Sequence, residues 1–126
     1  MPNSTFRIAV VGAGDTGTPL LQQLLAAPFV TLLGVADLDA EAPGMRLARQ
    51  KGVRTTTDFM DLARLGDGVD ILIDVTGAPK VREALRRHMR DTDNHHTVIM
   101  HETIAQLMLS LSKGELVRFK HDISDY

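Results

Sequence analysis

The chain has 126 residues, of which 44% are apolar and 24% are charged. That composition predicts one globular domain and excludes a disordered chain. The formal net charge of −2 offers no basic surface to nucleic acid, and the lack of cysteine excludes disulfides, thiolate metal sites and a cysteine nucleophile. We find no signal-peptide pattern and no apolar run of membrane-spanning length, so we expect a cytoplasmic chain without membrane insertion.

Strand and helix patterns alternate along the chain. Apolar, β-branched runs predict strands over 6–11, 30–36, 53–56, 69–75 and 97–100. Apolar residues at helical spacing predict helices over 15–27, 43–51, 58–65, 80–90 and 102–116. This alternation indicates βαβ units, and therefore a doubly wound parallel α/β sheet of about five strands in the order 3-2-1-4-5, with helices on both faces. We expect one domain over 1–118 and a polar tail over 119–126.

A glycine pattern follows the first predicted strand and opens the first predicted helix. Its members are Gly12, Gly14 and Gly17. In this context the first glycine permits a tight turn, the second lets the backbone approach a pyrophosphate, and the third lets the helix pack close to the strand. The backbone amides at the helix N-terminus then face the phosphates. The pattern therefore predicts a dinucleotide-binding loop.

An acidic residue ends the second predicted strand. Asp37 lies twenty positions after Gly17, which is the spacing that dinucleotide-binding loops show. Its carboxylate can accept hydrogen bonds from both hydroxyls of a ribose, and it would repel the 2′-phosphate of NADP. We therefore favour NAD as the cofactor over NADP. Asp39 either caps the entry to the next helix or contacts the adenosine.

Two further residues of the glycine loop belong to the predicted site, namely Asp15 and Thr16. Asp15 also leaves a second interpretation open. A carboxylate at a helix N-terminus can satisfy the amides that a phosphate would otherwise use. In that case the glycines only shape a turn in a fold that binds nothing. We favour dinucleotide binding because the strand, the helix and the acid all stand where that function needs them.

Three segments resemble the glucose–fructose oxidoreductase and inositol dehydrogenase family. They are residues 6–14 with the glycine pattern, residues 35–39 around Asp37, and residues 69–79 with the fourth strand and its loop. Homoserine dehydrogenases and dihydrodipicolinate reductases are similar in the third segment. The resemblance spans about residues 6–111 and implies a Rossmann domain that binds NAD(P).

The resemblance also implies roles for individual residues. By it, the three glycines hold the pyrophosphate and Asp37 binds the adenosine ribose. The loop after the fourth strand lies beside the nicotinamide ribose in that family. This adds three residues to the predicted site, namely Thr76, Gly77 and Pro79.

One departure from the family bears on catalysis. The family carries a Glu-Lys-Pro motif after its fifth strand and uses the lysine in catalysis, whereas this chain has His101-Glu102-Thr103 there. The substrate-binding domain of the family has no counterpart in the sequence. Hydride transfer needs a substrate held against the nicotinamide and a group that exchanges its proton. We therefore expect binding without hydride transfer by this chain alone, and we assign no catalytic residue.

A second resemblance is to the N-terminal domain of some bacterial sensor histidine kinases. It is carried by residues 42–44, 73–77 and 98–101, the last of which lead into the final helix. In those proteins the final helix leads toward signalling modules, which implies a ligand-sensing or regulatory role. Here that helix carries an apolar stripe. We expect at least the first half of the stripe to pack on the sheet, and the helix to offer a surface for a homodimer; its members are Ile104, Leu107, Met108 and Leu111.

Three histidines lie near the fifth predicted strand. His95, His96 and His101 lack the spacing of metal ligands, and the first two are typical of a surface loop. His101 stands at the carboxyl end of the strand, where doubly wound folds bind ligands. We include it in the site as a cofactor contact or proton partner, while a helix-entry role remains open.

The leading hypothesis is an NAD(H)-binding module with a sensing or regulatory role and a dinucleotide as its partner. The alternative is the cofactor-binding half of an NAD(P)-dependent oxidoreductase whose substrate domain is missing or supplied by another chain. A third class, the S-adenosylmethionine-dependent methyltransferases, also uses a glycine turn and an acid after the second strand. The dinucleotide spacing disfavours that class.

Overall fold

Parallel strands form the centre of the protein in the computed structural model, which describes residues 5–15 and 17–118. Within these residues, a five-stranded sheet has the order β3-β2-β1-β4-β5. The order confirms the topology expected from the sequence. All neighbouring strands are parallel, so their carboxyl ends share one edge of the sheet. The strands are β1 Phe6–Val11, β2 Val30–Ala36, β3 Thr55–Thr56, β4 Ile71–Asp74 and β5 Val98–His101.

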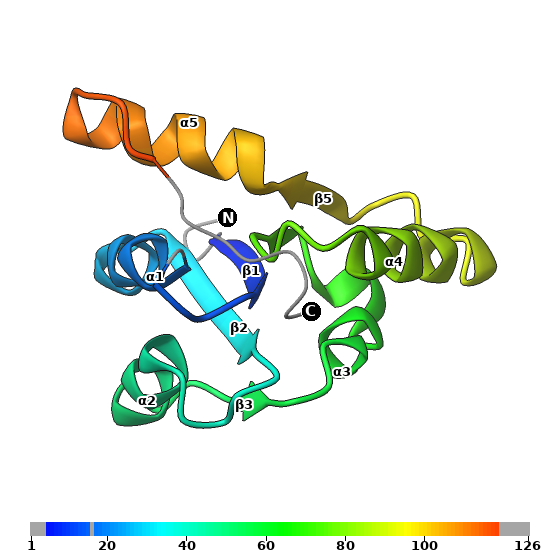
Figure 1. Cartoon of the computed structure of the whole chain (residues 1–126). Helices are drawn as coiled ribbons and strands as arrows, with labels where there is room; N and C mark the ends of the chain where they lie inside the picture. Colours follow the sequence, from blue (N-terminus) through cyan, green and yellow to red (C-terminus); the bar gives the residue numbers. More distant parts are fainter. Residues whose placement is uncertain (1–4, 16, 119–126) are drawn as a thin grey trace.

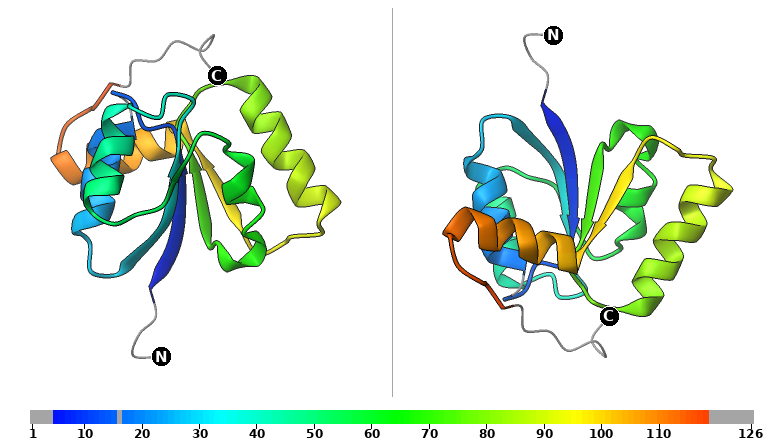
Figure 2. Two further views of the ribbon diagram at one scale, coloured as in Figure 1. Left: turned by 90° about the horizontal axis from the view of Figure 1, so that it is seen from below. Right: turned by 90° about the horizontal axis from the view of Figure 1, so that it is seen from above.

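Helices cover both faces of the sheet (Figures 1 and 2). On one face lie α1 (Gly17–Ala26), α2 (Pro43–Gln50) and α5 (Glu102–Lys113), and on the other lie α3 (Met60–Ala63) and α4 (Pro79–Asp91). Two apolar clusters correspond to these two interfaces. The first includes Leu21 and Met45, and the second includes Leu62 and Leu85. The result is a three-layered, Rossmann-like α/β fold.

The ends of several elements differ from the sequence-based expectation. The first helix begins at Gly17 rather than at residue 15, and the third strand is reduced to Thr55–Thr56, which pair with the last residues of β2. The third helix shortens to α3, and Gly66–Gly68 form a short 3-10 helix. The final helix stops at Lys113 instead of 116, because Gly114 adopts a left-handed backbone with a φ of 75°. The expected tail over 119–126 lies outside the described residues.

The apolar stripe of α5 does not pack on the sheet as expected. Ala105 and Leu109 are the fully buried residues of the helix instead, and Ala105 belongs to the apolar cluster on this face of the sheet. The four stripe residues are consequently about half exposed or more: Ile104, Leu107, Met108 and Leu111. No helix in the described part of the chain is long and apolar enough to cross a membrane.

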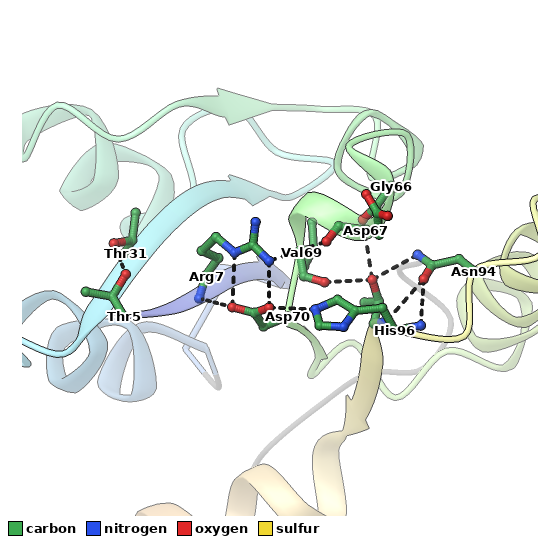
Figure 3. A network of polar contacts seen from close by, with 10 residues as sticks. Thr5, Arg7, Thr31, Gly66, Asp67, Val69, Asp70, Asn94 and His96 are labelled. Carbon is green, nitrogen blue, oxygen red and sulfur yellow. Dashed lines mark hydrogen bonds and ion pairs between the residues drawn. The ribbon is translucent and has the colours of Figure 1, made fainter. Parts of the chain in front are cut away.

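A polar network joins the starts of three strands at the amino edge of the sheet (Figure 3). Asp70, just before β4, accepts two hydrogen bonds from the Arg7 guanidinium, of 3.1 and 2.9 Å, and one from the Arg7 backbone N–H. Nε2 of His96, just before β5, lies 2.7 Å from the same carboxylate. The network therefore ties together β1, β4 and the loop that enters β5, at the edge opposite the glycine loop.

The same contacts determine how Asp70 titrates. The side-chain hydrogen bonds from Arg7, followed by the Arg7 backbone N–H and the His96 ring, hold the pKa of Asp70 well below its usual range. The pKa of Arg7 is raised, chiefly by its hydrogen bond to Asp70. Because the Asp70 side chain is 23% exposed, solvent screens part of this effect.

Leu109 and Leu111 provide a matched test of how α5 is oriented. Leu109→Ala removes a fully buried side chain, and we expect it to lower the free energy of unfolding by about 2–5 kcal/mol. Leu111→Ala changes a side chain that is 71% exposed in the single chain, and at protein concentrations low enough to keep the chain monomeric we expect a change within about 0.5 kcal/mol. Urea unfolding of both variants measures the difference. Equal destabilisation by the two substitutions would mean that the helix is rotated differently.

The Asp70 network predicts a dependence of stability on pH. Because the folded pKa of Asp70 is depressed, its contribution is present above the unfolded pKa of about 4 and is lost as the pH falls below that value. We expect Asp70→Asn to have a lower free energy of unfolding than the wild type at about pH 7, and the difference between the two free energies to become smaller toward about pH 3. Urea titrations at several pH values measure this difference.

The matched control for Asp70 is Asp67→Asn. Asp67 contributes its backbone oxygen to Arg7, at 3.5 Å, so its substitution keeps that contact. If the difference in unfolding free energy between the wild type and Asp70→Asn stayed constant with pH, the assignment of the depressed pKa to this carboxylate would be wrong.

Candidate functional site

Two glycines of the loop between β1 and α1 are required by the fold itself. Gly12 has a φ of 107°, and a Cβ built there would lie 2.9 Å from Cγ2 of Val75. A Cβ on Gly17 would lie 2.1 Å from the carbonyl oxygen of Gly12, which is far inside van der Waals contact. The start of α1 therefore lies directly against the end of β1. These two glycines would be needed even in a domain that binds no ligand.

Gly14 differs from both of its neighbours in the pattern. Its φ is not positive, and a Cβ built on it would have no atom within 4 Å among the described residues other than its chain neighbours. Neither backbone conformation nor packing therefore explains why glycine stands there. A side chain at this position would project into the open space in front of the loop, where a ligand would approach the backbone. The arrangement fits a pyrophosphate group, which needs close approach to loop amides.

Asp37 connects the end of β2 to the glycine loop. Its Oδ2 accepts a hydrogen bond of 2.8 Å from the backbone N–H of Ala13, and its Oδ1 accepts one of 2.9 Å from the N–H of Asp39. A carboxylate offers about four acceptor positions, so two remain for the hydroxyls of a ribose. The side chain is half-buried and its orientation is already fixed by the two amides.

The start of α2 also supports the glycine loop, a contact that sequence reasoning did not identify. The backbone N–H of Gly44 donates a 2.8 Å hydrogen bond to the carbonyl oxygen of Ala13. A Cβ on Gly44 would lie 2.7 Å from that oxygen, so the close approach requires glycine. The available signal was Pro43-Gly44 at a helix start, because glycine is costly inside a helix unless a neighbour must come close.

Three other predicted positions near the loop have different outcomes. Asp15 is exposed, next to the open space in front of Gly14. Thr16 lies outside the described residues. Asp39 accepts a hydrogen bond of 2.9 Å from the N–H of Glu41, which makes a local turn before α2. The N-cap of α2 is Ala42 and no side chain caps it, so Asp39 does not cap this helix, and the adenosine contact stays a prediction.

The loop after β4 is organised by a buried acid. Asp74 is 3% exposed, and its Oδ1 accepts hydrogen bonds from both the N–H and the hydroxyl of Thr76, at 3.0 and 2.6 Å. The Thr76 hydroxyl in turn accepts a 3.2 Å bond from the N–H of Ala78. Gly77 follows with a φ of 68°, and Pro79 is the first residue of α4. Thr76 therefore shapes this loop, while Gly77 gives it a turn that other residues rarely adopt.

His101 lies beside this acid on the neighbouring strand. Asp74 and His101 are register partners at the ends of β4 and β5, and Nδ1 of His101 lies 3.2 Å from Oδ2 of Asp74. The His101 side chain is 20% exposed, so the ring is accessible from one side. Sequence reasoning included His101 in the site but did not identify Asp74. The available signal was an acid that ends an apolar strand.

The structure thus brings the predicted site residues together at the carboxyl edge of the sheet. The glycine loop, Asp37, the Thr76 loop and His101 follow β1, β2, β4 and β5 respectively. His95 and His96 lie at the opposite edge, where they contact Asp93 and Asp70. Among the described residues, no three histidine, aspartate or glutamate side chains could hold a metal ion together.

Comparisons with known proteins identify relatives in sequence and in fold. No protein-family model matches the chain. The chain is 41% identical over 82 residues to an acetaldehyde dehydrogenase from Salinispora arenicola, a match that covers 64% of this chain and 27% of the relative. It is 36% identical over 76 residues to an acetaldehyde dehydrogenase from Ralstonia pickettii, covering 58% and 24%. The chain therefore spans about a quarter of the length of these curated relatives.

Solved structures show the same fold at lower identity. A myo-inositol dehydrogenase from Corynebacterium glutamicum matches 87% of this chain and 33% of its own, with a TM-score of 0.58 and 20% identity. GenD2 from gentamicin A biosynthesis, solved with NAD, matches 89% and 33% with a TM-score of 0.59 and 24% identity. A 3-ketoreductase variant from Actinomadura kijaniata, solved with NADP, matches 93% and 38% with a TM-score of 0.60 and 16% identity.

These comparisons confirm the resemblance to inositol dehydrogenases at the level of the fold. Among the matches are structures solved with NAD and with NADP. The resemblance to sensor histidine kinases stays a prediction.

Proposed function

We propose that the chain is the dinucleotide-binding unit of an NAD-dependent oxidoreductase. The observation that carries this proposal is Gly14, a glycine that the fold does not need and that leaves the front of the loop open to a phosphate group. The pyrophosphate would lie on the loop amides at the start of α1, and Asp37 would receive the adenosine ribose. When bound, the cofactor would accept or donate a hydride.

The loop after β4 provides the other half of the proposed site. In doubly wound sheets a dinucleotide lies across the point where the strand order reverses, which is here between β1 and β4. With the adenosine at Asp37, the nicotinamide riboside would lie toward Thr76, Gly77 and Pro79. The negative charge of Asp37 supports NAD over NADP, because it would repel a 2′-phosphate.

The comparisons favour an oxidoreductase over a sensing module. Both sequence relatives and two of the solved structures are named as dehydrogenases or a ketoreductase. These names support the alternative from the sequence analysis, the cofactor-binding half of an oxidoreductase. These proteins are about three to four times as long as the matched region. We propose that the substrate is held by a further part of the protein or by another chain, and that the unit works in the cytoplasm.

The exposed face of α5 supports a second part of the proposal. Leu107 and Leu111 are each more than half exposed on the same side of the helix, one turn apart. When another surface covers apolar side chains that are grouped in this way, the free energy of the system decreases. We propose that two copies of the chain associate through this face.

Gly14 provides the direct test of dinucleotide binding. A methyl group at this position meets no atom of the described residues beyond its chain neighbours, so Gly14→Ala should unfold at about the same urea concentration as the wild type. It should bind NADH at least about tenfold more weakly, because the methyl group stands where the phosphate approaches. Calorimetric titration of the wild type and the variant measures this.

The matched control for Gly14 is Gly68→Ala. Gly68 also has open space around its Cβ position and no positive φ, but it lies at the opposite edge of the sheet. We expect it to bind NADH like the wild type. If the wild type bound no NADH, or if both variants bound it equally well, the assignment of the loop would be wrong.

Asp37 tests the choice between NAD and NADP. Asp37→Asn keeps one side-chain oxygen as an acceptor and removes the negative charge. We expect this variant to bind NAD more weakly. We also expect the ratio of the dissociation constant of NADP to that of NAD to fall by about tenfold or more. Asp39→Asn is the control, because Asp39 contacts only its local turn among the described residues. An unchanged preference in Asp37→Asn would overturn the role given to this carboxylate.

Leu111 tests the proposed association of two copies. We expect the wild type to have the mass of a dimer in light scattering after gel filtration, and Leu111→Glu to be monomeric, because a buried charge is costly. Leu38→Glu is the control, since Leu38 is also exposed but lies after β2. A monomeric wild type at micromolar concentration would rule out this association.

A further inference from the structure

A buried carboxylate and a histidine form a pair that the proposed binding of phosphate and adenosine does not use. Asp74 is 3% exposed at the end of β4, and a buried carboxylate needs hydrogen bonds or a positive charge nearby. Thr76 satisfies Oδ1 with its N–H and hydroxyl. Oδ2 is left to His101, whose Nδ1 lies 3.2 Å away. The pair is thus held by the sheet on one side and by the Thr76 loop on the other.

The chemistry of Asp74 determines which ring nitrogen of His101 carries the proton. An ionised carboxylate only accepts hydrogen bonds, so Nδ1 of His101 must donate. In the neutral ring, Nε2 is then unprotonated and can accept a proton. When it does, the resulting imidazolium is stabilised by the carboxylate of Asp74. The arrangement therefore prepares His101 to gain and lose a proton at Nε2.

The position of the pair relates it to one end of the proposed cofactor. Asp37 follows β2, on one side of the glycine loop, and the pair follows β4 and β5 on the other side. Because a dinucleotide crosses the sheet edge where the strand order reverses, the nucleoside opposite the adenosine lies over β4 and β5. That nucleoside carries the nicotinamide. The side chain of His101 is 20% exposed, so it can face a ligand there.

We propose that His101, oriented by Asp74, couples its own protonation to the redox state of the bound nicotinamide. This inference rests on the proposed dinucleotide-binding function. The oxidised nicotinamide ring carries a positive charge and the reduced ring is neutral. An imidazolium beside it repels the oxidised ring, so protonation of His101 shifts the preference toward NADH. By linkage, binding of oxidised NAD expels the proton from His101 to the same extent.

The other charges around His101 do not provide this coupling. The elements that pack against β5 are β4, α5 and, through Ile99, α4. Asp74 is the charged group of β4, and Glu102 and Lys113 lie at the two ends of α5. The charged and titratable groups of α4 are Lys80, Arg82, Glu83, Arg86, Arg87, His88, Arg90 and Asp91. Asp74 is the ion-pair partner of His101 within the described residues. Histidine is the side-chain type whose unperturbed charge change falls in the neutral range. His101 is the histidine that the described structure places at the carboxyl end of a strand, so we assign the proton exchange to its ring.

The test compares the affinities for NAD and NADH as the pH changes. We expect the ratio of the dissociation constant of NAD to that of NADH to rise as the pH falls from about 8 to 5.5, by at most about tenfold per pH unit for one proton. In His101→Gln the ratio should stay constant while NADH still binds. His96→Gln is the matched control, because His96 lies at the opposite edge of the sheet, and its ratio should follow the wild type.

Each result separates the coupling from the binding itself. If both dinucleotides bind the wild type with a ratio that does not change with pH, or if His101→Gln keeps the wild-type slope, the coupling is wrong and the binding site stands. If neither dinucleotide binds at any pH, the proposed function itself fails. Should His101→Gln not fold, nuclear magnetic resonance of the wild type decides. Its His101 ring signal should titrate at lower pH with oxidised NAD than with NADH, and identical titrations overturn the proposal.

Discussion

The close contact between Gly17 and the carbonyl oxygen of Gly12 is the constraint on which the site depends. A Cβ on Gly17 would lie 2.1 Å from that oxygen, so the first turn of α1 can reach the end of β1 only because no side chain stands there. This contact positions the N-terminus of α1 at the carboxyl edge of the sheet. Without it the helix would move away from the strand, and its amides would no longer face the space before Gly14.

Acidic side chains then fix the loops around this helix start. Asp37 binds the N–H of Ala13 and so connects the end of β2 to the glycine loop. Asp74 holds Thr76 and His101, and so connects the ends of β4 and β5. At the other edge Asp70 joins the strand starts through Arg7. A site whose loops are held by such bonds loses little conformational freedom when a ligand binds.

The two edges of the sheet carry different kinds of polar groups. At the amino edge, an ion-pair network links the strand starts and stabilises the fold. Within the described residues, the carboxyl edge has space in front of Gly14, acceptor positions on Asp37 and a histidine that is partly exposed. This edge therefore combines the groups that the proposed NAD site needs.

Sequence periodicity predicted the fold well because strands buried on both faces require continuous apolar runs. The runs at 6–11 and 30–36 coincide with β1 and β2. It predicted α5 poorly, since its two faces both carry large apolar residues. The pattern could not show that Ala105 and Leu109 would be buried while Leu111 stayed exposed. That choice depends on how close the helix backbone can come to the sheet.

What the sequence determined by itself is the order of the strands, the glycine loop and the acid after β2, because these depend on local pattern and spacing. What only the tertiary structure decided is which groups meet across strands. Asp74 and His101 are 27 positions apart and become partners through sheet register. The tertiary structure also decided that the three glycines have different roles. Two of them are explained by packing against neighbouring chain segments, whereas a Cβ on Gly14 would have no atom within 4 Å among the described residues beyond its chain neighbours.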